Sequence, residues 1–172
     1  MSNGTSDVLV SIVMGSKSDL RVMQAAADTL RAFAVPYELD IVSAHRTPNK
    51  LHDYASRLVE RNIAVVIAGA GGAAHLPGMI AAHTIVPVIG VPVAATKLEG
   101  MDSLLSIVQM PAGVPVATVA VDNAENAAVL AAQIVAPLLP GLRDRLLDHK
   151  KALEDKVLDS AKETAQRHIP TQ

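Results

Sequence analysis

The chain has 172 residues, half of them hydrophobic and 19% charged, and its formal net charge is −2. This length and composition suit one domain with a sizeable core. The sequence contains no cysteine, which excludes disulfides, zinc–thiolate sites and thiol nucleophiles. It also has only three aromatic residues and no basic block, so it lacks the stacking platforms and cationic surface that nucleic-acid binding uses. No nucleic-acid partner is therefore expected.

No segment has the pattern of a membrane span or of a signal peptide. The longest apolar stretches are interrupted by Gly, Pro or His before they reach the roughly 18 residues that a membrane-spanning helix needs. Residues 1–7 are polar and lack the basic start and apolar run of a signal peptide. These patterns, with the absence of cysteine, predict a cytoplasmic protein whose partner is a small molecule or another protein.

The first half of the chain alternates strand and helix patterns. Residues 8–14 are an apolar, β-branched run that predicts a buried strand ending at Gly15. A helical period then runs from Asp19 until Pro36 stops it. The predicted apolar face of this helix consists of Leu20, Met23, Ala27, Leu30 and Ala34. Residues 37–42 predict a second strand.

The alternation continues beyond the second strand. Thr47 as N-cap and Pro48 at the first helical position both favour the start of a helix. Its predicted apolar face consists of Leu51, Ala55, Leu58 and Val59. Further strands are predicted at residues 63–68, 86–91 and 116–121. Further helices are predicted at residues 75–83, at residues 102–109 with Asp102 or Ser103 as cap, and at residues 124–138.

Strands that alternate with helices favour right-handed crossovers and a parallel sheet covered on both faces. The nearly continuous apolar strands agree, because such a sheet buries both sides of each strand. We therefore expect a three-layer α/β fold built on a flavodoxin-like, doubly wound, parallel five-stranded sheet. Such sheets bind ligands at the carboxyl ends of their strands, so the loops after the first three strands are the candidate sites.

The C-terminal segment has a different character. Pro140 and Gly141 break the chain, and residues 142–166 then predict one long, charged, amphipathic helix. Its apolar stripe consists of Leu142, Leu146, Leu153, Val157 and Ala161. Because the sheet is complete before this point, we expect residues 1–138 to form the α/β domain. Residues 139–172 would form a helical extension that packs on a neighbouring subunit or, alternatively, on its own domain.

The first candidate loop, residues 15–19, reads Gly-Ser-Lys-Ser-Asp between a strand and a helix. Free backbone N–H groups and the helix dipole favour an anion such as phosphate there. Asp19 cannot hold a phosphate, but it can accept hydrogen bonds from ribose hydroxyls. The alternative is that Ser18 or Asp19 only caps the helix. The loop is neither a Walker A motif nor a Gly-x-Gly-x-x-Gly turn, so a nucleoside triphosphate or a dinucleotide is not indicated.

The second loop, residues 43–48, reads Ser-Ala-His-Arg-Thr-Pro. Arg46 can clamp a phosphate with two hydrogen bonds. Histidine is a side chain suited to proton transfer near neutral pH, so His45, at a strand end beside a cation, is a candidate acid–base. The alternative is a hydrogen-bonded surface histidine in a turn.

The third loop, residues 68–79, contains eight Gly or Ala residues among twelve. Small residues let the backbone approach a ligand closely, and its N–H groups can bind a carboxylate. The alternative is a glycine turn that allows tight strand–helix packing.

Two other chemistries fit the sequence less well. Ser16 or Ser18 with His45 and Asp19 has the residue types of a hydrolase triad, but the Gly-x-Ser-x-Gly pattern is absent. The four histidines that a metal could use lack the spacing of known ligand sets, and we expect no metal. These are His45, His52, His75 and His83, of which His52 and His83 are expected on helix surfaces.

In this order, the three loops resemble those of the N5-carboxyaminoimidazole ribonucleotide mutase family. The resemblance rests on residues 13–19, 43–48, 68–79 and 102–111, the last reading Asp-Ser-Leu-Leu-Ser-Ile-Val-Gln-Met-Pro, and it covers about residues 8–138. It implies an isomerase of de novo purine biosynthesis. This enzyme moves the carboxyl group of N5-carboxyaminoimidazole ribonucleotide from nitrogen to C4, through CO2 held in a closed site, without ATP, metal or organic cofactor. It also implies an octamer with active sites between subunits, whose C-terminal helices reach onto neighbours.

By motif position, the resemblance implies roles for single residues. His45 would be the acid–base that moves a proton between the ring carbon and nitrogen. Phosphate would bind Ser16, Ser18 and Arg46, and ribose would bind Asp19. The base and CO2 would be surrounded by Ser43, Ala44, Gly71, Ala73, Ala74, His75 and Leu76.

Two alternatives remain open from the sequence. One is a related animal class that carboxylates aminoimidazole ribonucleotide directly with CO2, although that class lacks the second and third loops as they stand here. The other is a flavodoxin-like nucleotide-binding module, for example for flavin mononucleotide. Residues 94–100 and those after 138 match the family only loosely.

Overall fold

The computed structural model describes residues 8–167, so residues 1–7, for which no signal peptide is predicted, lie outside the described part. Its five strands are β1 (Val10–Met14), β2 (Tyr37–Ile41), β3 (Val65–Gly71), β4 (Val88–Val93) and β5 (Ala117–Thr118). They form one parallel sheet in the order β2-β1-β3-β4-β5. This order confirms the predicted flavodoxin-like, doubly wound sheet.

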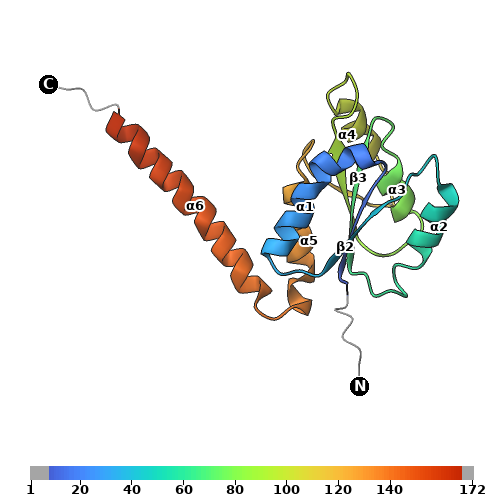
Figure 1. The fold of residues 1–172 in the computed structure, drawn as a ribbon, viewed down its shortest axis with the longest axis horizontal. Helices are drawn as coiled ribbons and strands as arrows, with labels where there is room; N and C mark the ends of the chain where they lie inside the picture. The colour runs from blue at the N-terminus through green and yellow to red at the C-terminus, as the bar shows by residue number, and fades with distance from the viewer. Residues whose placement is uncertain (1–7, 168–172) are drawn as a thin grey trace.

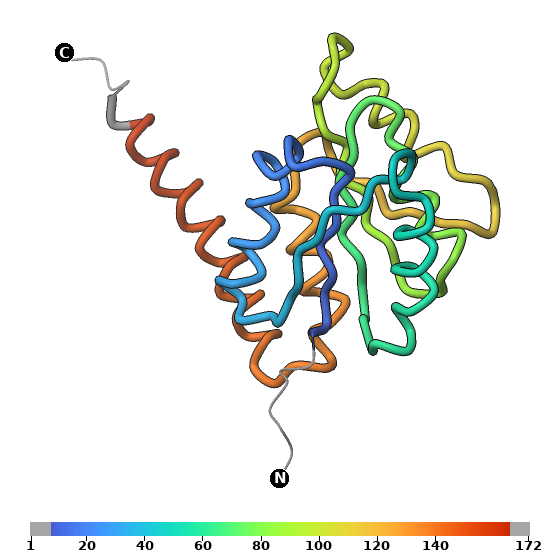
Figure 2. The backbone as a smooth tube through the Cα atoms, turned by 45° about the vertical axis from the view of Figure 1, so that its right-hand side comes forward, coloured from blue at the N-terminus to red at the C-terminus, as the bar shows by residue number. Residues whose placement is uncertain are grey.

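Helices cover both faces of the sheet. The helices are α1 (Leu20–Ala32), α2 (Pro48–Ser56), α3 (Leu76–Ala81), α4 (Met101–Val108), α5 (Ala124–Val135) and α6 (Leu142–Arg167), with short 3-10 turns η1 (Lys17–Asp19) and η2 (Ala136–Leu138). Helices α1 and α5 lie side by side on one face, and α2 and α3 lie on the other (Figure 1). Helix α6 runs away from this three-layer body (Figures 1 and 2). Among residues 8–167, no helix has both the length and the hydropathy needed to cross a bilayer.

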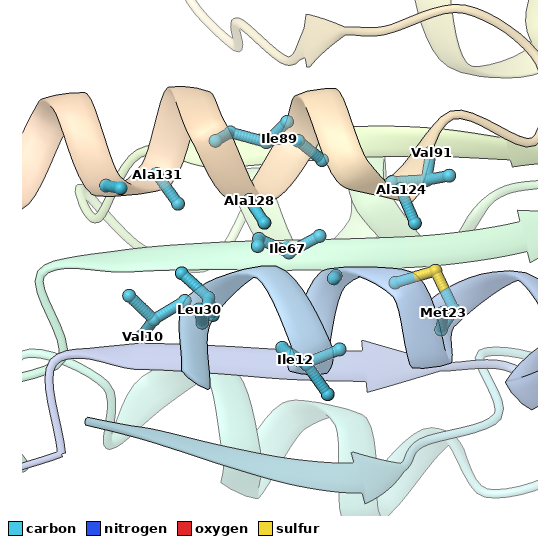
Figure 3. Packing of buried hydrophobic residues seen from close by; sticks show 14 of the residues in the cluster. Val10, Ile12, Met23, Leu30, Ile67, Ile89, Val91, Ala124, Ala128 and Ala131 are labelled. Carbon is cyan, nitrogen blue, oxygen red and sulfur yellow. The ribbon is translucent and has the colours of Figure 1, made fainter. Parts of the chain in front are cut away.

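Each face of the sheet has its own hydrophobic core. On the α1–α5 face, Ile12, Ile67 and Ile89 from three neighbouring strands pack beneath the two helices (Figure 3). Helix α5 meets the sheet through a row of fully buried alanines: Ala124, Ala127, Ala128, Ala131 and Ala132. Their small side chains let the helix lie close to the strands, which explains why so Ala-rich a helix is central to the core.

The ends of several elements differ from the sequence prediction. Helix α1 ends at Ala32, and Ala34, which was assigned to its apolar face, is exposed with a positive φ of 52°. The N–H groups of Ala34 and Val35 donate to Arg31 and Leu30, so the helix closes in a Schellman motif that periodicity does not reveal. Val59 was likewise assigned to the face of α2, but it follows the helix and is 53% exposed.

The later strands and caps also differ. Strands β3 and β4 end two or three residues later than predicted, because residues 68–71 pair with residues 90–93 despite their Gly and Pro content. Strand β5 has only two residues instead of six. Gly100, with a φ of 87°, precedes α4 as its N-cap, so neither Asp102 nor Ser103 caps the helix as predicted. Helix α5 ends at Val135 and continues as η2.

Helix α6 begins on its own domain. Leu142 is fully buried, Leu146 packs against the α1–α5 core, and the Nε of Arg145 donates to the backbone oxygen of Phe33 at 2.8 Å. Farther along, Leu153 and Val157 of the predicted apolar stripe are 51% and 68% exposed. The first turns of the helix therefore belong to the body, and no other part of residues 8–167 covers its later apolar stripe.

Candidate active site

A cavity of about 380 Å³ opens at the carboxyl edge of the sheet, where the fold class predicts it. Its lining comes from the loops after β1, β2 and β4, from the last residues of β3, and from the segment that leads into α3. Five polar residues form what we call the polar wall: Ser16, Ser18, Asp19, Ser43 and Arg46. Six small or apolar residues form the apolar wall: Ala44, Ala70, Gly71, Ala73, Leu76 and Ala95. Gly15 and His45 complete the lining.

The first loop presents hydroxyls and one buried carboxylate. Ser16 caps η1, and its Oγ accepts hydrogen bonds from the backbone N–H and the Oγ of Ser18, at 3.4 and 3.0 Å. Asp19 is only 5% exposed and makes no side-chain capping bond to α1. Burial raises the pKa of Asp19, although a hydrogen bond from Ser18 and the charges of Arg21 and Arg46 act in the opposite direction. Asp19 lines the cavity without capping α1, so its carboxylate can accept hydrogen bonds from a ligand in addition to the one from Ser18.

The second loop is tied to the first by Arg46. Its Nε donates to the Oγ of Ser43 at 3.2 Å, and its Nη2 donates to the backbone oxygen of Gly15 at 3.1 Å. Thr47 occupies the predicted N-cap position of α2, but its hydroxyl folds back and donates to the backbone oxygen of Ser43 at 2.9 Å. The guanidinium therefore lies beside the Ser-Lys-Ser-Asp loop, where the two loops offer a combined set of anion donors.

His45 forms a pair with His75. The Nε2 of His45 lies 2.8 Å from the Nδ1 of His75, and the two rings meet edge to face with centroids 4.9 Å apart. A hydrogen bond between these nitrogens needs one N–H and one lone pair, so the two rings cannot both be doubly protonated while it exists. The contact with His75 fixes the orientation of the His45 imidazole at the cavity, and proton transfer requires such a positioned ring.

The apolar wall is shaped by backbone approach. Gly71 ends β3, and a methyl group there would lie 2.5 Å from the Cβ of Ala95. The next residue, Gly72, has a positive φ of 67°, and its N–H donates to the Oγ of Ser103 at 2.8 Å. Ser103 is fully buried and donates in turn to the backbone oxygen of Val93 at 2.8 Å. One hydroxyl on α4 thus joins the ends of β3 and β4 behind the cavity.

The structure brings most of the predicted site residues together. Ten line the cavity: Ser16, Ser18, Asp19, Ser43, Ala44, His45, Arg46, Gly71, Ala73 and Leu76. Two do not line it. Ala74 is 1% exposed and belongs to the core below, and His75 touches the site through His45.

Three lining residues were not singled out from the sequence. Gly15 and Ala70 lie inside the quoted loops, so their place in the motif was a usable signal. Ala95 lies outside them, and nothing in its sequence neighbourhood marked it. Within residues 8–167, no three His, Cys, Asp or Glu side chains converge as metal ligands, and His52 and His83 contact each other with ring centroids 5.1 Å apart.

Comparisons with known proteins agree on one family. The model of the family described as AIR carboxylase matches residues 9–156. An N5-carboxyaminoimidazole ribonucleotide mutase of Pyrococcus horikoshii is 57% identical over 154 residues, covering 90% of this chain and 87% of that protein. The mutase of Thermotoga maritima is 54% identical over 157 residues, covering 91% of this chain and 92% of that protein.

A third relative and a solved structure extend the comparison. A phosphoribosylaminoimidazole carboxylase of Schizosaccharomyces pombe is 55% identical over 153 residues, which are 89% of this chain and 28% of that protein. The crystal structure of Treponema denticola PurE superposes with a TM-score of 0.81 at 26% identity, covering 90% of this chain and 97% of that one. With the family model matched along most of its length and relatives more than half identical, this chain belongs to the AIR carboxylase family.

Proposed function

We propose that this chain is a 5-(carboxyamino)imidazole ribonucleotide mutase of de novo purine biosynthesis. It moves the carboxyl group of N5-carboxyaminoimidazole ribonucleotide from nitrogen to C4 and forms 4-carboxyaminoimidazole ribonucleotide. The observation that carries the proposal is the position of His45 in one cavity with the polar and apolar walls. The names of the similar proteins from Pyrococcus horikoshii and Thermotoga maritima support it.

The polar wall binds the nucleotide part of the substrate. Ser16, Ser18 and Arg46 hold the phosphate, because hydroxyls and a guanidinium from two adjoining loops offer several donors to one anion. Asp19 accepts hydrogen bonds from the ribose hydroxyls. Its raised pKa reflects the desolvation of its carboxylate, and ribose donors would replace part of the water it has lost.

The base and the migrating CO2 occupy the region of Ser43, Ala44, Gly71, Ala73 and Leu76, with Ala74 and His75 behind it. Small apolar residues leave room for the planar ring and offer CO2 no strong hydrogen bond. They also exclude water, which keeps CO2 close to C4 and makes its recapture effectively intramolecular.

The chemistry needs one proton donor and acceptor. When the bond between N5 and the carboxylate breaks, its electron pair stays on nitrogen, which takes a proton from His45. C4 then attacks the released CO2, and the proton that leaves C4 returns to His45. His45 recovers as many protons as it gives, so one imidazole suffices for the reaction. No step consumes ATP or needs a metal or an organic cofactor. His75 orients the ring of His45 through the bond between Nε2 and Nδ1.

Helix α6 supports a proposal for assembly. The exposed stripe that includes Leu153 and Val157 has an apolar character suited to a neighbouring subunit. We place residues 1–138 as the catalytic domain and residues 139–172 as an extension that packs on this domain through Leu142 and Leu146 and reaches the neighbour through its later turns, in a homo-octamer. A cytoplasmic location agrees with a small nucleotide substrate and the absence of cysteine.

A turnover assay tests the proposed function. N5-carboxyaminoimidazole ribonucleotide is supplied without ATP and with a chelator, and the C4-carboxylated isomer is followed by ultraviolet absorbance. We expect rapid conversion by the wild-type protein and strongly reduced conversion by His45→Ala. A folded protein that binds the nucleotide without converting it would contradict the proposal.

The second candidate is direct carboxylation of aminoimidazole ribonucleotide, because one similar protein carries the name carboxylase. Under that function, aminoimidazole ribonucleotide with bicarbonate at low concentration would serve as well as the N-carboxylated substrate. The mutase function requires the N-carboxylated substrate to be much the better one.

A further inference from the structure

Ala94, the residue that precedes Ala95, has both its backbone N–H and its backbone oxygen held by side chains from other elements. The backbone N–H of Ala94 donates to Oδ1 of Asp122 at 2.9 Å. The backbone oxygen of Ala94 accepts from Nη2 of Arg21 at 2.5 Å. Ala94 follows the last residue of β4, where the sheet no longer supplies a partner for either group. Two charged side chains therefore replace the lost strand pairing.

Asp122 is itself fixed. It lies in the turn between β5 and α5 with a positive φ of 58°, and its N–H donates to the backbone oxygen of Pro92 at 2.8 Å. An aspartate tolerates this left-handed conformation better than most residues do. The backbone of Asp122 thus bonds to Pro92 of β4, and its carboxylate bonds to Ala94 two residues farther along. Asp122 is therefore attached to the end of β4 at two points.

Arg21 is the second residue that holds Ala94, and we call Arg21 and Asp122 together the clamp. Arg21 belongs to the first turn of α1, two residues after Asp19 of the polar wall. Its Nη1 lies 3.7 Å from Oδ2 of Asp122, so the two side chains that hold Ala94 also face each other. Both are part-exposed, at 54% and 36% of their side-chain area, and the proposed function assigns neither of them a contact with the substrate.

The clamp sets the position of Ala95. If Gly71 carried a methyl group, that group would lie only 2.5 Å from the Cβ of Ala95. The space between Gly71 and Ala95 therefore holds the Ala95 methyl group and no second one. Ala95 is also the residue that the loop after β4 contributes to the cavity. A small shift of the Ala94 peptide would open the apolar wall between these strand ends.

We propose that Arg21 and Asp122 are positioning residues that hold Ala95 against Gly71 and so seal the apolar wall while CO2 is free. The inference rests on the proposed mutase function. Without the seal, CO2 leaves the cavity after the N–carboxylate bond breaks. The nitrogen keeps its new proton, aminoimidazole ribonucleotide is released with CO2 in place of the isomer, and His45 regains its proton from solvent. The clamp thus governs how the intermediate partitions, separately from how well the nucleotide binds.

The test measures this partition. Wild-type, Asp122→Ala, Asp122→Asn and Arg21→Ala proteins are each given N5-carboxyaminoimidazole ribonucleotide. The ratio of aminoimidazole ribonucleotide to the C4-carboxylated isomer is then determined by chromatography. Loss of carboxylate in an enzyme-free reaction is subtracted. Arg31→Ala is the matched control, because Arg31 lies on the same helix and pairs with Asp28 away from the cavity. Melting temperatures of all variants report folding.

We expect Asp122→Ala and Arg21→Ala to raise the ratio about twofold to tenfold, the effect of one lost hydrogen bond, while KM changes little. Asp122→Asn keeps an acceptor for the N–H of Ala94 and should restore most of the wild-type ratio, and Arg31→Ala should match wild type. If Asp122→Ala does not fold, Arg21→Ala on the part-exposed helix face decides the test. An unchanged ratio, or a uniform loss of activity in which both products fall together, would overturn the proposal. A wild-type protein that forms no isomer would instead overturn the proposed function.

Discussion

The two walls of the cavity are built in different ways. The polar wall consists of side chains from two loops that are bonded to one another, as Arg46 is to Ser43 and to Gly15. The apolar wall consists mostly of Gly and Ala, and where β3 and β4 end its shape depends on backbone positions that Ser103 holds through Gly72 and Val93. We therefore expect the polar wall to determine the affinity for the nucleotide. The apolar wall, whose shape is set by closely approaching backbone segments, should determine how much space the reacting groups have.

His45, which lies in the same cavity as both walls, should give the largest effect. Replacing His45 by Ala removes the acid–base group, so kcat should fall by on the order of 10²–10⁴-fold while nucleotide affinity stays near wild type. Steady-state kinetics and equilibrium titration with the substrate analogue aminoimidazole ribonucleotide measure the two quantities. His52→Ala, on the surface of α2, is the control. Full activity of His45→Ala would refute its role.

The apolar wall should respond next. Gly71→Ala places a methyl group 2.5 Å from the Cβ of Ala95, so the strand ends must separate, and a displacement of about 1 Å can lower kcat by on the order of 10²-fold. Affinity for the nucleotide should change little, because the polar wall is untouched. The double variant Gly71→Ala with Ala95→Gly removes the opposing methyl and should recover much of the lost turnover. A double variant as slow as the single one would count against this packing.

The polar wall should show the reverse pattern. Arg46→Ala removes the guanidinium that joins the two loops, and hydrogen bonds to charged groups contribute about 1.5–3 kcal/mol, so KM should rise by roughly 10- to 100-fold. Arg46→Lys keeps the charge but not the paired donors and should fall between wild type and Ala. Steady-state kinetics measure KM, and an unchanged KM in Arg46→Ala would remove Arg46 from the phosphate site.

Replacing Asp19 by Asn should give the smallest effect, a small change in the stability of the folded protein. Burial raises the pKa of Asp19 above the ordinary 3.8, so the folded protein binds this proton more tightly than the unfolded chain does. The contribution of Asp19 to stability is therefore greatest below pH 3.8 and falls as pH rises through the raised pKa. Asp19→Asn removes this penalty and should melt slightly higher than wild type at neutral pH, with the difference shrinking toward pH 3.8. Thermal melts across this range measure it.

Asp19→Asn should also bind substrate more weakly, because an amide is a poorer acceptor for the ribose hydroxyls. A variant that melts lower than wild type at neutral pH would show that the carboxylate stabilises the fold. That outcome would contradict the assignment of Asp19 to a ligand.

The sequence predicted those parts of the site that are local. Residues 15–19 and 43–48 each follow a strand directly, so their places at the sheet edge follow from the fold class alone. Ala95 and Ser103 could not be predicted in the same way, since each acts through residues distant in sequence: Ala95 through Gly71, and Ser103 through Gly72 and Val93. Periodicity located the helices, but it does not reveal the Schellman ending of α1, which consists of local backbone hydrogen bonds, or the two-residue length of β5, which depends on its pairing with β4.

The most direct test of the central claim follows the carboxyl carbon itself. N5-carboxyaminoimidazole ribonucleotide with an isotopically labelled carboxylate is converted in the presence of excess unlabelled bicarbonate, and mass spectrometry gives the label in the product. If the two walls retain CO2 until C4 captures it, most product molecules keep the label. Product that carries mainly unlabelled carboxylate would mean that CO2 exchanges with solvent and that the cavity does not perform a closed transfer.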